Sequence, residues 1–302
     1  MKHLGQKPPG LVLTSASERD PPLMTSGVMV AGMHRSGTSA VTRVVNLLGV
    51  PLGREDDIYT AEDNPTGHWE SMTLSELNEM ILHLFGGFDM GMPTMPRSWL
   101  RSRRAVYLRD VMRATFDNVY QGERWLWKDP RICLTLPLWR QVLDDFCVVF
   151  VVREAGPVTR SLHRREGFPI AYCYALWEDY NRRVVAASSG LPVVTVDFDS
   201  MLEDPLHQVK LLSEGLSSVG VRLNGEIDTA AASVHRPGRA DPTAGSGRGQ
   251  RLAAALKGGP NVSQIFRPPP LPAQPWWVRP TLRAGCSWIK TRERWTDSMG
   301  RP

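Results

Sequence analysis

One segment near the N-terminus dominates the fold prediction: Val28-Met29-Val30-Ala31-Gly32-Met33-His34-Arg35-Ser36-Gly37-Thr38-Ser39. Residues 27–32 form a short apolar run that is typical of a buried parallel strand. A loop with two glycines follows, and residues 39–48 then repeat apolar side chains at the spacing of a helix. We therefore predict a strand, a phosphate-binding loop and a helix in direct succession.

The predicted loop has the chemistry of an anion-binding site. The backbone N–H groups of such a loop point inward, and the N-terminus of the next helix carries partial positive charge. Gly32 and Gly37 let the backbone wrap closely around a phosphate. Arg35 adds a fork-shaped cation, and Thr38 and Ser39 add hydroxyl donors. The triphosphate-binding loop has a lysine at the position of Thr38, so the sequence argues against an ATP or GTP hydrolase.

Strand and helix signals alternate along the rest of the chain. Strands are predicted at 125–127, 146–152 and 192–196, and helices at 71–85, 98–120, 138–143, 157–165, 170–188 and 205–219. Because the strands are apolar and alternate with helices, we predict an α/β, P-loop-like fold of three layers, with a central parallel sheet and helices on both faces. Turn formers at 50–70 predict a loop across the mouth of the site, and residues 86–97 are expected to line it too.

Composition divides the chain into three parts. We predict a flexible N-terminal arm at 1–26, the α/β domain at 27–235, and a basic, poorly ordered tail rich in Gly, Pro and Arg at 236–302. From Arg236 onward, ten Arg and two Lys face three acidic residues, a net charge of +9, although the whole chain carries only +5. The basic character therefore belongs to the tail, and we expect no specific nucleic-acid partner.

The remaining composition argues against several classes of protein. The chain has 302 residues, 42% of them hydrophobic and 22% charged, which is ordinary for a globular protein. No apolar run reaches the roughly 18 residues of a transmembrane helix, and a secretory signal is lacking. We therefore expect a cytoplasmic protein without a transmembrane segment. The four cysteines form no C-x-x-C pair and no Cys/His cluster, so we predict buried, reduced thiols and no metal site.

Residues 32–39, Gly-Met-His-Arg-Ser-Gly-Thr-Ser, resemble the 5′-phosphosulfate loop of sulfotransferases that use 3′-phosphoadenosine 5′-phosphosulfate (PAPS). In that family an Arg at a strand end and a Ser eight residues later grip the 3′-phosphate, and Arg153 and Ser161 match this element. The resemblance spans residues 28–219 and is closest to bacterial sulfotransferase-domain proteins, which also share features of residues 64–70 and 128–131. It implies PAPS as co-substrate, without a metal, bound by Gly32, His34, Arg35, Ser36, Gly37, Thr38, Ser39, Arg153 and Ser161.

The resemblance also implies roles in the transfer itself. Sulfuryl transfer needs a base for the acceptor proton and cations for the charge that builds on the phosphate oxygens. Arg35 is the expected contact of the 5′-phosphosulfate, and Lys128 is expected to serve the leaving oxygen. Glu70 is the expected base, with His68 as the alternative.

Three further residues keep more than one interpretation. His34, inside the loop, either packs or contacts the sulfate, and a catalytic role is the weaker alternative. Asp129 either orients Lys128 or caps a turn. Arg131 either binds an acidic acceptor or pairs with a carboxylate.

The function predicted from the sequence is transfer of a sulfuryl group from PAPS to a hydroxyl. The acceptor is expected to be a small molecule or a glycan, with a carbohydrate or glycolipid as the leading candidate by analogy with the bacterial proteins. Two alternatives stay open: a P-loop nucleotide-binding protein or kinase with a degenerate loop, and a non-catalytic sulfotransferase-like module. The sequence leaves the oligomeric state open.

Overall fold

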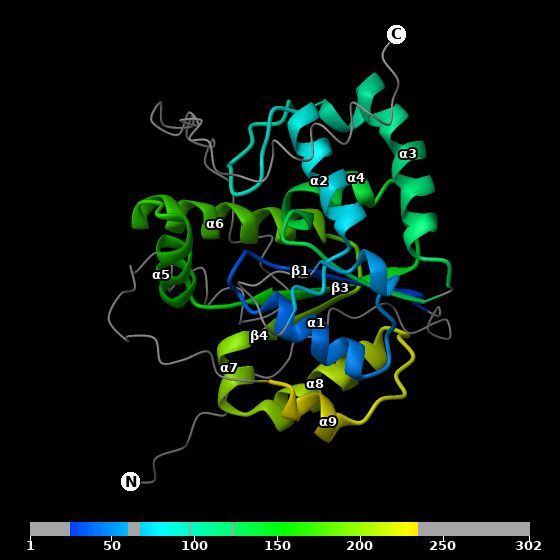
Figure 1. Ribbon diagram of the computed structural model, residues 1–302, viewed down its shortest axis with the longest axis vertical. Helices are drawn as coiled ribbons and strands as arrows, with labels where there is room; N and C mark the ends of the chain where they lie inside the picture. The colour runs from blue at the N-terminus through cyan, green and yellow to red at the C-terminus, as the bar shows by residue number, and fades with distance from the viewer. Residues whose placement is uncertain (1–24, 60–66, 97, 123, 235–302) are drawn as a thin grey trace. The chain divides into compact units, whose positions relative to one another are not determined.

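The computed structural model describes residues 25–59, 67–96, 98–122 and 124–234, which all belong to one compact unit, Met1–Arg267 (Figure 1). The predicted arm, apart from its last two residues, and the predicted tail at 236–302 lie outside the described residues. Four parallel strands form one sheet in the order β2-β1-β3-β4. They are β1 (Gly27–Ala31), β2 (Trp125–Lys128), β3 (Phe146–Val152) and β4 (Val193–Asp197).

The carboxyl ends of all four strands meet at one edge of the sheet. β1 lies between β2 and β3, with Val30 opposite Lys128 and Ala31 opposite Phe150, while the end of β3 pairs with Asp197 of β4. The chain passes from β1 to β2 on one side and then to β3 on the other, so the strand order reverses at β1. In open α/β sheets, ligands bind outside the carboxyl ends at such a reversal. The predicted phosphate loop begins there, directly after β1.

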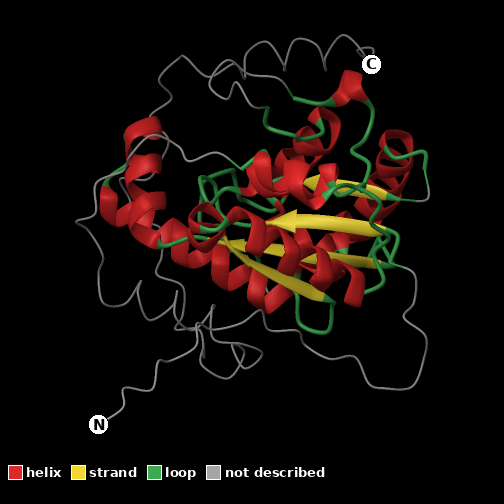
Figure 2. Cartoon of the chain, turned by 90° about the horizontal axis from the view of Figure 1, so that it is seen from below, coloured by secondary structure: helices red, strands yellow, loops and turns green. Residues whose placement is uncertain are grey.

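Helices cover both faces of the sheet (Figures 1 and 2). One face carries α1 (Thr38–Leu47), α7 (Phe198–Glu203), α8 (Pro205–Ser218) and α9 (Ile227–Ala232). The other carries α2 (Met72–Leu84), α3 (Arg103–Val119), α4 (Ile132–Trp139) and α6 (Ile170–Ala187), with α5 (Ala155–Glu166) packed on α6. This arrangement confirms the predicted α/β fold. None of the helices in the described part of the chain combines the length and hydrophobicity needed to cross a bilayer.

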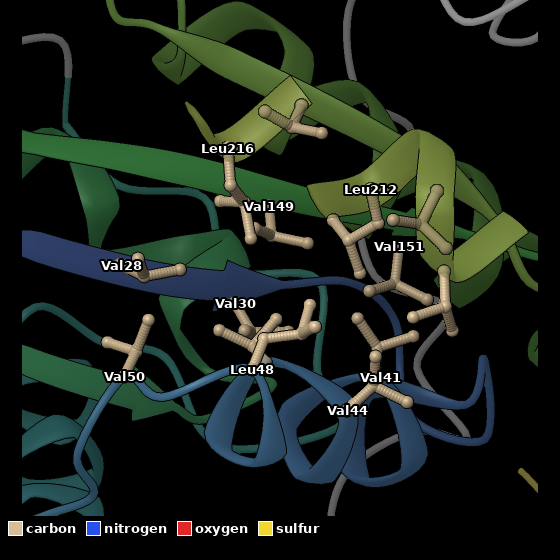
Figure 3. Close-up of a cluster of buried hydrophobic side chains, with 14 of the residues drawn as sticks. Val28, Val30, Val41, Val44, Leu48, Val50, Val149, Val151, Leu212 and Leu216 are labelled. Atoms are coloured by element: carbon tan, nitrogen blue, oxygen red, sulfur yellow. The ribbon is translucent and has the colours of Figure 1, made fainter. Parts of the chain in front are cut away.

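The core beneath α1 shows why the apolar pattern produces this layer. Val28 and Val30 of β1 lie in one cluster with Val41 and Val44 of α1 and with Leu48, which follows the helix (Figure 3). All of them are fully buried. Burying a side chain of this kind stabilises the fold by about 1.5–3 kcal/mol. The helical spacing of these residues therefore fixes α1, and with it the loop that precedes α1, against the sheet.

Most element boundaries agree with the sequence prediction, and four helices do not: α3, α4, α7 and α9. The helix predicted at 138–143 is wrong in position, because α4 spans Ile132–Trp139. Nearly all of α4 is apolar and buried, so it has no amphipathic stripe, and Pro137 obscures its interior. The stretch 98–120 divides at Ser102, whose side chain caps α3, after a short 3₁₀ turn at Trp99–Arg101. The short helices α7 and α9, six residues each, were not predicted.

Candidate functional site

The loop between β1 and α1 passes too close to its neighbours for side chains at its two glycines. A Cβ atom at Gly32 would lie 2.6 Å from the carbonyl oxygen of Val151 in β3. Gly37 has a φ of +91°, and a Cβ atom there would overlap the ring of Phe198 in α7. The left-handed backbone and the close approach both require glycine. The loop is therefore held tightly between β3 and α7.

The same loop offers hydrogen-bond donors that lack a partner among the described residues. The first N–H groups of a helix have no partner within the helix, and α1 begins at Thr38, with Ser39 next to it. The hydroxyl of Ser36 is buried and has no hydrogen-bond partner among the described residues. Buried polar groups in native proteins nearly always have a partner. A loop with an unsatisfied hydroxyl and a free helix N-terminus fits an anion.

The structure joins the loop to the distant Arg and Ser that the sequence paired with it. Arg153 follows β3 directly, and Ser161 lies in α5. The Nε of Arg35 donates to Ser161 Oγ at 2.9 Å. The Nη1 of Arg153 approaches the carbonyl oxygen of Arg35 at 3.4 Å. Two cations and a hydroxyl therefore gather at one end of the loop, beside the strand reversal.

Sequence analysis did not identify the residue that holds Arg153. Asp199, in the first turn of α7, accepts a hydrogen bond from Arg153 Nε at 3.1 Å. Its second oxygen accepts one from the backbone N–H of Glu154 at 2.8 Å. The guanidinium of Arg153 also lies 5.3 Å from the ring centre of Phe198. The position of Asp199, two residues beyond β4, is the signal that would have pointed to it, because strand ends meet at this edge.

A second group of site residues is built around a buried ion pair. Lys128, the last residue of β2, pairs with the carboxylate of Glu70. The side chain of Lys128 is 2% exposed and that of Glu70 is 13% exposed. The segment before Glu70 has a left-handed backbone at Gly67 and Trp69, and the Trp69 ring lies under the guanidinium of Arg43 in α1 at 4.8 Å. These contacts bring Glu70 to the end of β2.

Electrostatics keep Glu70 charged. Burial raises the pKa of Glu70, but the charge and hydrogen bond of Lys128, with the charges of Arg131 and His34, hold that pKa below its ordinary value. The carboxylate is therefore ionised at neutral pH and able to accept a proton. His68, the alternative base, packs its ring edge-on against Tyr59 at 5.2 Å.

The structure decides between the two interpretations of Arg131 and Asp129. Arg131 lies within 3.5 Å of three carboxylates, those of Asp129, Asp89 and Glu79, so it serves an ion-pair network. Asp129 accepts a hydrogen bond from the backbone N–H of Arg131 at 2.8 Å, and therefore caps the turn before α4. Asn78 donates to the other oxygen of Asp129 at 2.8 Å. Burial raises the pKa of Asp129 above its ordinary value.

His34 turns away from solvent and toward a carboxylate. Its Nε2 lies 2.9 Å from Oδ1 of Asp89, in the segment after α2. Its ring lies 5.9 Å from that of Tyr180 in α6. Asp89 was not identified from the sequence, because it stands in a stretch of Gly, Met and Pro without periodicity. Only the folded chain brings it to the loop.

A cavity of about 520 Å³ lies elsewhere, where α4 and α6 cross. Its walls include Met95 and Trp99, together with Arg140 and Arg183. Met95 belongs to the stretch 86–97 that was predicted to line the acceptor site. None of the cavity residues is among those assigned to the phosphate loop or to its partners. Within the described ranges, no group of three or more His, Cys, Asp and Glu is arranged to hold a metal ion.

Comparisons with known proteins return sulfotransferases among solved structures. No family model and no curated protein matches the sequence. The sulfotransferase domain of the Synechococcus PCC 7002 olefin synthase matches with 15% identity, over 95% of this chain and 100% of that one, at a TM-score of 0.40. Sulfotransferase STF1 from Mycobacterium tuberculosis H37Rv matches with 18% identity, over 70% and 72%, at 0.41. Retinol dehydratase in complex with retinol and PAP matches with 13% identity, over 70% and 65%, at 0.33.

Proposed function

We propose that the protein is a sulfotransferase that moves the sulfuryl group of PAPS to a hydroxyl acceptor. The observation that carries this proposal is the 2.9 Å hydrogen bond from Arg35 to Ser161, with Arg153 beside it. A single phosphate loop needs only one cluster of donors. Here a second cluster of cation and hydroxyl stands next to the loop, which suits a nucleotide with phosphate on both ends of its ribose.

The loop fits the 5′ end of such a nucleotide. Its tight glycines, the N-terminus of α1 and the Ser36 hydroxyl, which has no partner in the described part of the chain, form a cradle for a phosphosulfate, with Arg35 at its rim. Arg153 and Ser161 are the residues that would hold the 3′-phosphate. When bound, PAPS supplies a sulfuryl group whose bond to a phosphate oxygen breaks as a bond to the acceptor oxygen forms. We infer no need for a metal in this scheme.

Glu70 and Lys128 have different roles in the transfer. Glu70 takes the proton of the acceptor hydroxyl, and Lys128 stabilises charge at the leaving oxygen. Because Lys128 lowers the pKa of Glu70 more than Arg131 and His34 do, its shift toward the leaving oxygen would raise that pKa. Glu70 would thus become a stronger base at the moment when a proton has to be removed. His68 is kept as the alternative base.

The acceptor class and the compartment extend the proposal. We take a carbohydrate or glycolipid hydroxyl as the first acceptor class to test, by analogy with bacterial sulfotransferase-domain proteins. We place the protein in the cytoplasm, in agreement with the buried free thiols of Cys133, Cys147 and Cys173.

Calorimetric titration tests nucleotide binding. We expect PAP to bind well, and adenosine 5′-phosphate, which lacks the 3′-phosphate, to bind at least about tenfold more weakly. The variant Arg153→Ala should lose this preference. Arg164→Ala removes an exposed arginine of α5, the helix that follows β3 and contains Ser161, and should keep the preference. Tighter binding of ATP than of PAP would contradict the proposal and favour the degenerate P-loop alternative.

Transfer is tested by incubating the protein with radiolabelled PAPS and a panel of carbohydrate, glycolipid and phenolic acceptors. We expect label to move to one class of hydroxyl, and we expect Glu70→Gln and Lys128→Met to reduce that transfer strongly. PAP binding without transfer to any acceptor or to water would favour the non-catalytic module. Full activity of both variants would refute the roles given to Glu70 and Lys128.

A further inference from the structure

Asp89 connects parts of the chain that are far apart in sequence. Its Oδ1 lies 2.9 Å from Nε2 of His34 in the phosphate loop and 3.5 Å from the hydroxyl of Tyr180 in α6. Its Oδ2 lies 3.2 Å from Nη2 of Arg131, which stands between β2 and α4. The backbone N–H of Met90 donates to Oδ1 as well, at 2.9 Å. One carboxylate therefore ties three separate elements together.

The contacts of Asp89 are buried enough to be specific. The side chains of Asp89, His34 and Arg131 are 16%, 10% and 15% exposed. A partly solvated surface pair of this kind would be worth little, but buried, multiply bonded charges hold a fixed geometry. Burial raises the pKa of Asp89, yet the charges of His34 and Arg131 bring it well below its ordinary value. The carboxylate of Asp89 therefore faces Nε2 of His34 as a charged hydrogen-bond acceptor at 2.9 Å.

The partners of Asp89 belong to the two halves of the proposed site. His34 precedes Arg35 in the loop, which is assigned to the nucleotide. Arg131 follows Lys128 by three residues and pairs with Asp129. The charges of both His34 and Arg131 act on the carboxylate of Glu70. The contacts from His34 through Asp89 to Arg131 therefore connect the phosphate loop, which is proposed to bind the nucleotide, with Lys128 and Glu70, which are proposed to carry out the transfer.

We infer that Asp89 is a positioning residue that fixes the imidazole of His34 and the guanidinium of Arg131 in one arrangement, and so keeps the phosphate loop in register with Lys128 and Glu70. This inference rests on the proposed function. Asp89 contacts neither the nucleotide nor the acceptor in this scheme. It acts through His34, whose ring orientation it sets, as carboxylates do for other functional histidines.

The test compares Asp89→Asn with Asp56→Asn, the same substitution at an exposed ion pair with Arg54. The readouts are the dissociation constant of PAP and the rate of radiolabelled sulfate release from PAPS with water as acceptor. In that reaction the bond from sulfur to the phosphate oxygen breaks, the bond to the water oxygen forms, and PAP and sulfate leave. For Asp89→Asn we expect a rate at least about tenfold lower, with PAP binding within about threefold of wild type. Asp56→Asn should match wild type in both.

A double-variant cycle with His34→Asn separates positioning from a general loss of stability. If Asp89 acts through His34, the double variant should be no slower than the slower single variant. The inference would be overturned if the rate losses of the two single variants multiplied in the double variant. It would also be overturned by an unchanged rate in a folded Asp89→Asn protein. Failure of wild type to bind PAP would instead count against the proposed function.

A measurement on the wild-type protein covers the case in which Asp89→Asn does not fold. Nitrogen-15 spectra of labelled histidine rings report which ring nitrogen carries a proton. The His34 signal is identified by its loss in His34→Asn. We expect a protonated, hydrogen-bonded Nε2, in agreement with its contact to Asp89. A neutral ring with its proton on Nδ1 alone would show that Asp89 does not hold His34.

Discussion

Lys128 and Glu70 form a pair whose burial makes each side chain dependent on the other. Lys128 is almost fully buried and Glu70 nearly so. Removing one partner of a buried pair leaves an uncompensated charge, whereas removing both leaves none. The two residues that are proposed to carry the chemistry are therefore also part of the structure. Stability and activity should separate when the pair is replaced as a unit.

We predict that Lys128→Met lowers the free energy of unfolding by about 3–5 kcal/mol, because the carboxylate of Glu70 is left buried without its cation. Adding Glu70→Gln should restore at least about half of that loss, since the double variant has no buried charge at this place. Sulfuryl transfer should stay absent in both proteins. Urea denaturation and the transfer assay measure the two effects. Arg54→Met, at an exposed pair, is the control and should change stability very little. Equal stability of the single and double variants would contradict the pairing.

The buried carboxylates make the stability of the protein depend on pH. The pKa values of Asp89 and Glu70 are lowered in the folded protein from ordinary values of 3.8 and 4.5. Their contribution to stability is therefore present above those ordinary values and is lost as the pH falls toward the folded values. Asp129 has a raised pKa and the opposite sign, so its contribution is lost as the pH rises. The difference in the free energy of unfolding between wild type and a variant of one carboxylate isolates the contribution of that carboxylate.

We expect the free energy of unfolding of wild type to fall more steeply than that of Asp89→Asn between about pH 5 and pH 3. The reason is that only wild type gains a proton at Asp89 on unfolding in this range. Urea titrations at several pH values measure the two slopes. Parallel curves would mean that Asp89 is not held ionised by His34 and Arg131.

The phosphate loop is the element on which the site depends, and its glycines can be tested against a matched glycine elsewhere. Gly37 and Gly190 both have positive φ, +91° and +79°. A Cβ atom at Gly37 would overlap the Phe198 ring, whereas one at Gly190 would meet nothing within 4 Å. The two positions therefore share the backbone penalty and differ in the steric one.

We predict that Gly190→Ala lowers the free energy of unfolding by about 1 kcal/mol, the cost of a left-handed alanine. Gly37→Ala should lose about 1–3 kcal/mol more, because the methyl group overpacks against α7. It should also weaken PAP binding, since the loop has to move away from Phe198. Denaturation and calorimetry measure the two losses. Equal stability of the two variants would show that α7 can move away from a methyl group at Gly37 without a cost in stability.

Elements with a strong local signal could be predicted from the sequence. The apolar run of β3 and the helical spacing of α1 are visible in the sequence, because burial on both faces of the strand and on one face of the helix dictates these patterns. α4 could not be placed, because a helix buried nearly all round lacks a polar face. α7 is too short for a periodicity to show. Yet α7 contains Asp199 and Phe198, which contact Arg153, so two residues of the candidate site were missed because the local signal of α7 is weak.

The candidate site shows the same division. The loop was predicted from its own residues, and the pair Arg153 and Ser161 from the resemblance to sulfotransferases, because both features are local to a strand and the helix after it. Asp89 was missed because its role is defined by His34 and Arg131, which are distant in sequence, and not by its neighbours. The ion pair of Lys128 with Glu70 spans 58 residues. Lys128 and Glu70 were each named as candidates from the sequence, but the contact between them could not be predicted.

At the scale of the molecule, the site draws on the ends of all four strands. The loop follows β1, Lys128 ends β2, Arg153 follows β3, and Asp199 follows β4. A nucleotide held by the loop and by Arg153 would therefore touch elements from across the sheet. Because these elements share one buried core, binding should stabilise the unit as a whole and not the loop alone.

We predict that PAP at about 100 times its dissociation constant raises the free energy of unfolding by about 2.7 kcal/mol. For a unit of this size that corresponds to a rise in melting temperature of about 5–10 °C. The shift should appear in a single transition, because loop, strands and α7 unfold together. Adenosine 5′-phosphate at the same concentration should give a smaller shift, and Arg153→Ala should remove the difference between the two nucleotides. An early transition that PAP alone abolishes, with the main transition unmoved, would mean that the nucleotide orders only the loop and that the strand ends do not act as one site.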